Sequence, residues 1–202
     1  MLTEGGSFLV DWATYTFSLS NVILMGWLGL TILLNTERRE WGAWLAGVGL
    51  LLGSAFFVSH TAILAFGVDF YGRGLNFWWQ AGLVPVIGLP FIWYVLILWY
   101  SGFWEDRQSD LVRRQHWPLL LTFLLAIFLY SMLVIGNPAR NFIQAVTLNL
   151  QPSPSLFGLP LLVILYPIYI VACIALSVDA LRKPGPSDRV LGEVARQRAR
   201  PW

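Results

Sequence analysis

Long apolar segments alternate with short polar ones along most of the chain. Five apolar segments occupy residues 13–34, 41–67, 77–103, 118–135 and 158–181. Each is close to the roughly 20 residues that an α-helix needs to cross the hydrocarbon core of a bilayer. Backbone groups in lipid must bond within their own segment, which favours helices. The pattern therefore predicts an all-α polytopic membrane bundle, with five transmembrane helices in a module that covers residues 1–181.

The remaining residues, 182–202, form a basic tail with prolines and a glycine near its start. Residues 187–200 could form a short basic helix at the membrane surface. The run Arg-Gln-Arg-Ala-Arg-Pro-Trp at 196–202 resembles the Arg-Arg-Gln-His-Trp-Pro run at 113–118, which directly precedes the fourth apolar segment. Two interpretations stay open: a basic tail anchored by Trp202, or a chain cut just before a further span.

Composition places the chain in the membrane class. Hydrophobic residues make up 57% of the chain and charged residues 12%, about half the usual globular share of charge. The first basic residue is Arg38, so the N-terminus lacks the positive front of a secretory signal peptide, and we expect it to be uncleaved. The bilayer is the expected partner, a homodimer is allowed, and nucleic acid is not expected.

The basic residues predict the orientation of the helices, because positively charged loops are retained in the cytoplasm. Arg73 and Arg140 fall in the second and fourth polar segments. The other eleven of the 13 fall in the first segment, the third segment and the tail: Arg38, Arg39, Arg107, Arg113, Arg114, Arg182, Lys183, Arg189, Arg196, Arg198 and Arg200. We therefore expect a multi-pass protein of the cell (inner) membrane, with its N-terminus outside and its C-terminus in the cytoplasm.

Small residues mark one face of the second apolar segment. Gly42, Ala46, Gly49 and Gly53 follow one another at spacings of 4, 3 and 4, so they share a helical face and allow a neighbouring helix to approach closely. His60 continues this face seven residues later. The spacing predicts that His60 points towards protein rather than lipid.

Polar residues near the outer ends of the helices suggest a cleft that opens outwards. His60 lies about 28 Å along the helix from its cytoplasmic end. The candidate ligand-binding residues of this cleft are His60, Ser18, Asn21, Gln80, Asp69 and Arg73. An intramembrane ionisable residue points to function, and a small ligand would suit such a site. Ordinary hydrogen bonding between helices explains the same residues and stays open.

The third apolar segment contains two prolines, Pro85 and Pro90, flanked by Gly82 and Gly88. A proline inside a helix removes a backbone hydrogen bond and favours a kink, with neighbouring groups bonding the freed carbonyl. These prolines are candidate hinge residues. Membrane helices also tolerate such prolines without a functional role.

Several chemistries are excluded by the residues. The only lysine is Lys183, so a retinal Schiff base within the bundle is excluded. The single cysteine, Cys173, rules out an internal disulfide and a CxxC metal site. His60 and His116 lie near opposite ends of the spans, and the zinc motif HExxH is absent. We therefore expect no catalytic residues, no metal and no cofactor in this chain.

Part of the chain resembles the N-terminal membrane region of certain bacterial histidine kinases. The resemblance covers residues 21–104, and its marks are the run from Trp27 to Asn35, Glu37-Arg-Arg39, Trp41-Gly42, the run from Leu50 to His60, and Asn76-Phe-Trp-Trp79. It implies a sensory module that precedes phosphotransfer and ATP-binding domains, often after seven spans. Five spans and the absence of a kinase domain depart from that pattern.

Two other functions stay open beside the sensor. A structural subunit of a larger membrane complex would need only packing faces, which Gly42, Ala46, Gly49 and Gly53 supply. A small transporter subunit would need a continuous polar path, but the inner halves of the segments carry few polar residues. The sequence therefore favours a sensory module without a catalytic domain over these two alternatives.

Overall fold

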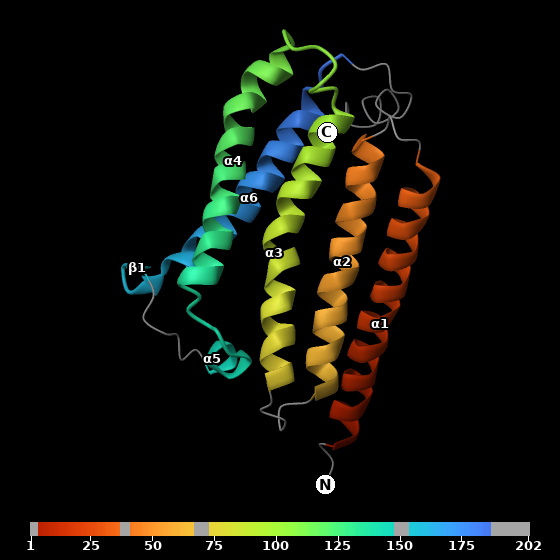
Figure 1. The fold of residues 1–202 in the computed structure, drawn as a ribbon, viewed down its shortest axis with the longest axis vertical. Coiled ribbons are helices and arrows are strands. Elements are labelled where there is room, and N and C mark those ends of the chain that lie inside the picture. Colours follow the sequence, from red (N-terminus) through yellow and green to blue (C-terminus); the bar gives the residue numbers. More distant parts are fainter. Residues whose placement is uncertain (1–3, 37–40, 67–72, 148–153, 187–202) are drawn as a thin grey trace. The chain divides into compact units, whose positions relative to one another are not determined.

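The computed structural model describes residues 4–36, 41–66, 73–147 and 154–186. These residues form almost only helices (Figure 1). In chain order the elements are α1 (Glu4–Asn35), α2 (Trp41–Phe66), α3 (Arg73–Tyr100), α4 (Asp110–Ile135), α5 (Phe142–Val146), β1 (Ser155–Leu156), β2 (Leu159–Pro160) and α6 (Leu161–Arg182).

Five of the described helices are long and apolar enough to cross a membrane. The candidate spans are Trp12–Asn35, Trp41–Ala65, Gly74–Tyr100, Asp110–Ile135 and Leu161–Arg182. The predicted all-helical, multi-pass membrane protein is therefore confirmed at this level. Each span overlaps one of the apolar segments that the sequence predicts.

Helix α4 begins well before the apolar segment predicted at 118–135. Its N-cap is Ser109, whose Oγ accepts a hydrogen bond of 3.4 Å from the backbone N–H of Val112. A serine at this position satisfies a backbone donor that the first turn leaves unpaired. The helix therefore starts at Asp110 and carries its polar first turns beyond the apolar run, which hydropathy alone does not predict.

Helix α3 ends earlier than the predicted segment 77–103. Gly102 has a φ of 83°, a left-handed conformation that glycine adopts without strain. The backbone N–H of Phe103 bonds the carbonyl of Leu98 at 3.1 Å across this turn. This is the geometry of a glycine helix C-terminus, so the helix stops at Tyr100.

The predicted polar segment 136–157 contains two small elements. Asn141 and Gln144 form a capping box at the start of α5. Strands β1 and β2 form an antiparallel hairpin with Ser155 opposite Pro160, and Gly158 in its turn has a φ of 80°. The hairpin leads directly into α6.

The chain divides into two compact units. The first consists of residues 1–86 and 139–151, and the second of residues 87–138 and 152–202. The division falls inside α3, between Val86 and Ile87, and therefore between Pro85 and Pro90. Helix α3 is continuous through both prolines and contributes residues to both units.

In the first unit, α1 and α2 lie side by side and antiparallel (Figure 1). Their backbones approach each other at two glycines. A Cβ atom added to Gly29 would lie 3.0 Å from the carbonyl oxygen of Gly47, and one added to Gly47 would lie 3.2 Å from that of Gly29. Small residues are what allow such a close approach between membrane helices.

In the second unit, the core forms between α4, α6 and the second half of α3. Its fully buried side chains include Tyr94, Leu98, Leu129 and Tyr169. The Tyr169 hydroxyl donates to the carbonyl of Ile87 at 2.9 Å. In a regular helix the N–H of residue 90 would bond the carbonyl of Val86, but Pro90 has no N–H. The carbonyl that Tyr169 bonds belongs to the next residue along the chain.

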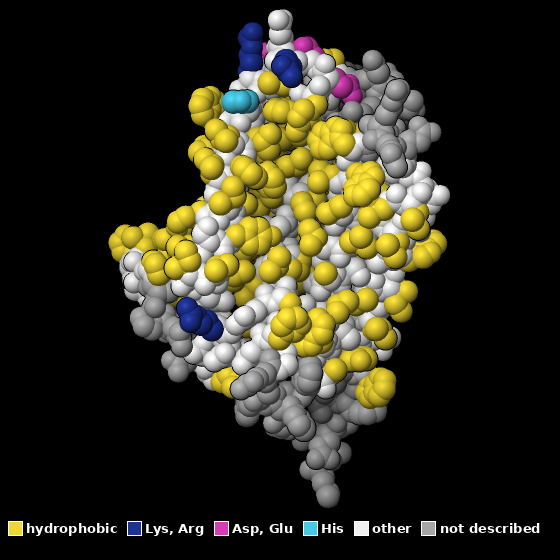
Figure 2. All heavy atoms as spheres, viewed as in Figure 1, with side chains coloured by type: hydrophobic (Ala, Val, Ile, Leu, Met, Phe, Trp, Pro, Cys, Tyr) yellow, Lys and Arg dark blue, Asp and Glu magenta, His cyan; other side chains and the backbone are white. Residues whose placement is uncertain are grey.

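Large hydrophobic side chains are exposed along all five spans. Each span has an example: Phe17 on α1, Trp44 on α2, Phe77 on α3, Leu121 on α4 and Val171 on α6. Figure 2 shows such side chains over the visible faces of the described helices. In water these apolar faces would favour aggregation, whereas in a bilayer they contact lipid tails.

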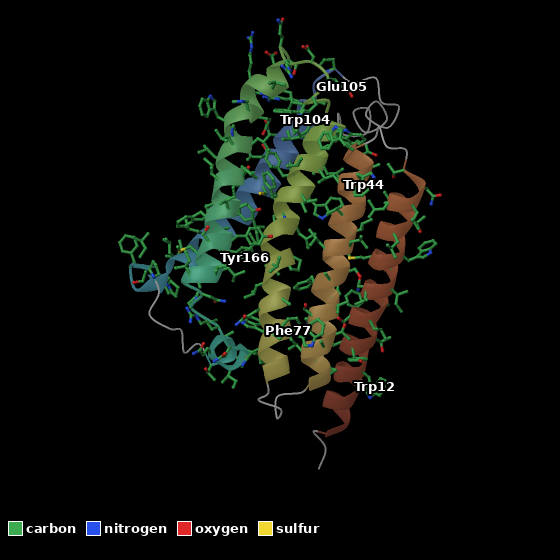
Figure 3. All side chains as sticks on the ribbon, viewed as in Figure 1. Trp12, Trp44, Phe77, Trp104, Glu105 and Tyr166 are labelled. Carbon is green, nitrogen blue, oxygen red and sulfur yellow. The ribbon has the colours of Figure 1, made fainter. Side chains whose placement is uncertain are left out.

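Several tryptophans lie near helix ends, as expected for residues at the headgroup level of a membrane. Trp12 on α1 and Trp44 on α2 lie near opposite ends of this helix pair (Figure 3), and both are exposed. In the second unit, Trp104 follows the end of α3 and is exposed. Trp27 and Trp93, which the sequence places deeper, are exposed as well.

Candidate functional site

A small polar cluster joins α1 to α2 at the end of the pair that contains Ser18. The hydroxyl of Ser18 lies 3.0 Å from Nδ1 of His60 and 2.8 Å from Oγ1 of Thr61. The hydroxyl of Thr61 donates to the carbonyl of Phe57, one turn earlier on α2, at 2.7 Å. Ser18 is only 1% exposed, so these contacts provide its partners in place of water.

The number of protons fixes the direction of each bond in this cluster. Thr61 has one hydroxyl proton, and its short contact with a carbonyl requires that proton. Ser18 must then donate to Thr61, and His60 must donate to Ser18 from a protonated Nδ1. We infer a relay from His60 through Ser18 and Thr61 to the carbonyl of Phe57. We refer to His60, Ser18 and Thr61 as the α1–α2 relay.

The His60 ring lies between two phenylalanines. Its centroid is 6.2 Å from that of Phe56, in a stacked arrangement, and 6.5 Å from that of Phe57, edge to face. Within the described part of the chain, Nε2 of His60 makes no hydrogen bond. A neutral imidazole with its proton on Nδ1 therefore presents Nε2 as an acceptor to a group that donates a hydrogen bond.

The structure does not gather all the predicted cleft residues around His60. The amide nitrogen of Asn21 donates to the carbonyl of Phe17 on its own helix at 2.8 Å. The amide nitrogen of Gln80 donates to the carbonyl of Arg140 at 3.0 Å. Asp69 lies outside the described residues, and of Arg73 only its place at the start of α3 is described. Ser18 and His60 are the pair that the structure brings together.

Gln80 belongs instead to a set of contacts that hold the segment around α5. The indole of Trp79 donates to the carbonyl of Ala139 at 2.9 Å, and Oδ1 of Asn76 accepts from the backbone N–H of Phe142 at 3.1 Å. The first turns of α3 therefore fix the backbone of residues 139–142. The sequence gives no sign of this role for Gln80.

The predicted small-residue face of α2 lies partly against α1. Gly42, Gly49 and Gly53 are buried and Ala46 is half-buried. A Cβ added to Gly53 would lie 2.9 Å from the sulfur of Met25 on α1. Sequence reasoning missed Gly47 and its partner Gly29 on α1, and also Gly26, which faces Ser54, although Gly26 and Gly29 are at a helical spacing of three.

A second polar cluster, which sequence reasoning did not identify, joins α3, α4 and α6 in the second unit. The hydroxyl of Tyr94 donates to Oε1 of Gln115 at 2.7 Å, and Nε2 of Gln115 donates to Oδ2 of Asp179 at 2.7 Å. Arg114 forms an ion pair with Oδ1 of Asp179 at 3.3 Å and donates to the carbonyl of Lys183 at 2.9 Å. We refer to this set as the exit cluster; its members are Tyr94, Gln115, Asp179 and Arg114.

One signal in the sequence could have revealed the exit cluster. Asp179 is a carboxylate inside the predicted apolar segment 158–181, where an ionisable group requires a partner. Its partners, Arg114 and Gln115, were placed in a polar loop. Because α4 starts at Asp110, both are on a helix and face α6. Among the described residues, no group of His, Cys, Asp or Glu could hold a metal ion.

Comparison with known proteins gives no further assignment. No protein-family model matches this chain, and neither the curated proteins nor the solved structures contain a match.

Proposed function

We propose that this chain is the membrane-embedded sensory module of a bacterial signalling protein. In this proposal, α3 transmits a signal from the α1–α2 relay to the exit cluster. The observation that supports the proposal is the course of α3. Its first half belongs to the unit that contains the α1–α2 relay, and its second half supplies Tyr94 to the exit cluster. In the proposed orientation, the relay lies near the outer face of the inner membrane and the exit cluster near the cytoplasm.

The input would be a small ligand that donates a hydrogen bond to Nε2 of His60. A ligand can shift a protein between two arrangements only if it binds one of them better. The relay offers such a difference, because a change in the tilt of α1 against α2 alters both contacts of Ser18. The simpler alternative is that the relay only stabilises the packing of α1 against α2.

The transmitting element would be α3. A helix with two interior prolines lacks two backbone hydrogen bonds and bends more readily than its neighbours. Here these prolines lie on either side of the division between the two units. The hydroxyl of Tyr169 bonds the helix just after that division, at the carbonyl of Ile87.

The output would leave through the exit cluster. Arg114 contacts both Asp179 on α6 and the carbonyl of Lys183, at the point where α6 ends and the basic tail begins. A movement of Tyr94 would therefore reach the start of the tail through the side chains of Gln115, Asp179 and Arg114.

A structural subunit of a membrane complex is the second candidate. The close approach of α1 and α2 at Gly29 and Gly47 favours it, since this contact serves packing alone. Such a subunit would need no coupling between the relay and the exit cluster. A transporter subunit receives no support from a particular contact.

The test joins the catalytic core of a histidine kinase to the chain after Trp202, through linkers that differ by one residue. Autophosphorylation is measured in membrane vesicles at equal expression. We expect Pro85→Ala to change the basal activity, and His60→Ala and Ser18→Ala to change it in at least one linker length. Ser20→Ala is the control, because the Ser20 hydroxyl is exposed and bonds only its own helix. If all three variants match the wild type at every linker length, the sensory proposal is wrong and a structural subunit is the better account.

A further inference from the structure

We propose that the second unit holds a binding pocket for the zwitterionic headgroup of a membrane lipid, a phosphate linked to a primary ammonium as in phosphatidylethanolamine. This proposal goes beyond the sensory function and does not depend on it. It rests on an open pocket of about 530 Å³ between the start of α4 and the residues that follow α6. Its charged lining residues are Asp106, Asp110, Arg113, Arg114 and Lys183.

The charged groups that line this pocket are three cations and two carboxylates, and none of them forms an ion pair with another. Arg114 forms its ion pair with Asp179, as described above. Among the described residues, the side chains of Arg113 and Lys183 form no ion pair, and neither do those of Asp106 and Asp110. Within the described part of the chain, two cations and two carboxylates therefore remain without an ion-pair partner. An anionic ligand would meet two carboxylates and a cationic one two cations, whereas a zwitterion satisfies both pairs.

Hydrogen bonds hold both walls of the pocket in place. On one side, the hydroxyl of Ser109 donates to the carbonyl of Asp106 at 2.8 Å, and the backbone N–H of Gln108 donates to Oδ1 of Asp106 at 2.9 Å. On the other side, the backbone N–H of Gly185 donates to the carbonyl of Ser101 at 2.9 Å. The pocket is therefore built before a ligand arrives, which lowers the entropic cost of binding.

The position of the pocket indicates a lipid rather than a soluble compound. Trp104 and Trp117 lie on either side of the pocket residues 106–114 in sequence and are 42% and 65% exposed. Exposed tryptophans at the ends of spans lie at the headgroup level of a bilayer. A pocket at this level meets lipid headgroups at far higher concentration than any dilute solute.

The ligand chemistry predicts the order of lipid preference. The primary ammonium carries three hydrogen-bond donors for Asp106 and Asp110, while the quaternary ammonium of phosphatidylcholine carries none. Phosphatidylglycerol carries the phosphate but no ammonium. Loss of one charge-assisted hydrogen bond lowers affinity by about tenfold. We expect phosphatidylethanolamine to be retained about tenfold more strongly than either of the other two lipids.

The experiment measures the lipids that stay bound to the purified chain, by native mass spectrometry after incubation with equimolar mixtures of the three lipids. In Arg113→Gln/Lys183→Gln we expect weaker retention of all three. In Asp106→Asn/Asp110→Asn we expect the preference to move to phosphatidylglycerol, because two cations then face the phosphate alone. Arg182→Gln is the matched control, since Arg182 precedes Lys183 but does not line the pocket. Circular dichroism checks that each variant keeps its helices.

Three results would overturn the proposal. The first is equal retention of phosphatidylethanolamine and phosphatidylcholine by the wild type. The second is an effect of Arg182→Gln as large as that of the pocket variants, which would indicate attraction by net charge only. The third is binding of soluble phosphoethanolamine without any retained lipid, which would assign the pocket to a solute from the aqueous phase.

Discussion

Among the small polar residues of α1, Ser18 differs from its neighbours in where its hydroxyl is directed. Thr14 and Ser20 bond carbonyls of their own helix, whereas Ser18 reaches His60 and Thr61 on α2. A hydroxyl that bonds its own helix is satisfied whether or not α2 is present. The Ser18 bonds exist only while α1 and α2 are packed, so they add to the stability of the pair.

The first prediction concerns this stabilisation. Ser18→Ala should lower the free energy of unfolding, measured by denaturation in mixed micelles, by about 1 kcal/mol, the usual scale of an interhelical hydrogen bond in membranes. The double variant with His60→Ala should show a coupling energy of about 0.6 kcal/mol. Ser20→Ala should have little effect. An equal loss for Ser18→Ala and Ser20→Ala would contradict the relay.

A second prediction follows from the order of protons in the relay. Nitrogen-15 NMR of histidine-labelled protein should show the His60 proton on Nδ1. The reason is that the Ser18 hydroxyl already donates its one hydrogen bond to Thr61 and can only accept from His60. His116 is the other histidine, and a His116→Gln variant assigns the signals. A proton on Nε2 of His60 would reverse the order of the bonds and remove the acceptor proposed for a ligand.

At this scale the sequence predicts faces but not partners. The spacing of three puts Ser18 and Asn21 near one face of a helix, yet the short amide of Asn21 bonds a carbonyl one turn back instead of another helix. Gln80 likewise bonds the backbone of Arg140, which is 60 residues away in sequence. Partners across such distances depend on how the chain folds, and no local spacing contains that information.

At the scale of helices, the close contact between α1 and α2 depends on glycine. Gly29 and Gly47 each face a backbone oxygen of the other helix, while Gly53 faces the flexible side chain of Met25. A backbone cannot move aside without shifting the whole helix, whereas a methionine can adopt another rotamer. The two kinds of glycine contact should therefore respond differently to a larger residue.

The third prediction uses this difference. Gly29→Leu should lower the free energy of unfolding by about 1–3 kcal/mol, the usual cost of overpacking, and should cost more than Gly53→Leu. Ala55→Leu on α2 is the control, because Ala55 is exposed and a larger side chain there meets no neighbour. Denaturation in mixed micelles measures all three. A Gly29→Leu variant as stable as Ala55→Leu would mean that the two backbones are not in contact.

The helices themselves were largely predictable, and their ends were not. Each apolar segment overlaps a span because about 20 apolar residues leave few alternatives to a membrane helix. The start of α4 depends instead on the cap at Ser109, and the end of α3 on the turn at Gly102. Hydropathy averages over many residues and does not respond to such single positions. The missed start of α4 also concealed Arg114 and Gln115, and with them the exit cluster.

At the scale of the whole molecule, the distribution of basic residues is the basis for the proposed orientation. Eleven of the 13 lie in the segments assigned to the cytoplasm. An odd number of membrane crossings predicts that the first and last spans lead to opposite sides of the membrane. The positive-inside rule therefore predicts an external N-terminus.

The fourth prediction tests this orientation with reporter fusions. Fusions after Arg39, Arg114 and Arg182 should behave as cytoplasmic, and fusions after Arg73 and Arg140 as external. The fusions after Arg73 and Arg140 act as internal controls, since they must report the side opposite to their neighbours along the chain. An external signal after Arg114 would be incompatible with five spans in this order.

The proposed function depends on coupling between the two units through α3, and spin-label distance measurements test this coupling most directly. Nitroxides at positions 108 and 182, both exposed and both in the second unit, report the end of this unit that contains Arg114 and Asp179, in a Cys173→Ala background. Pro85→Ala changes the first unit only, and Ala55→Leu in the same unit is the control. We predict that Pro85→Ala shifts the distribution of distances between the labels and that Ala55→Leu leaves it unchanged. A Pro85→Ala distribution that superimposes on that of the parent protein would contradict transmission through α3.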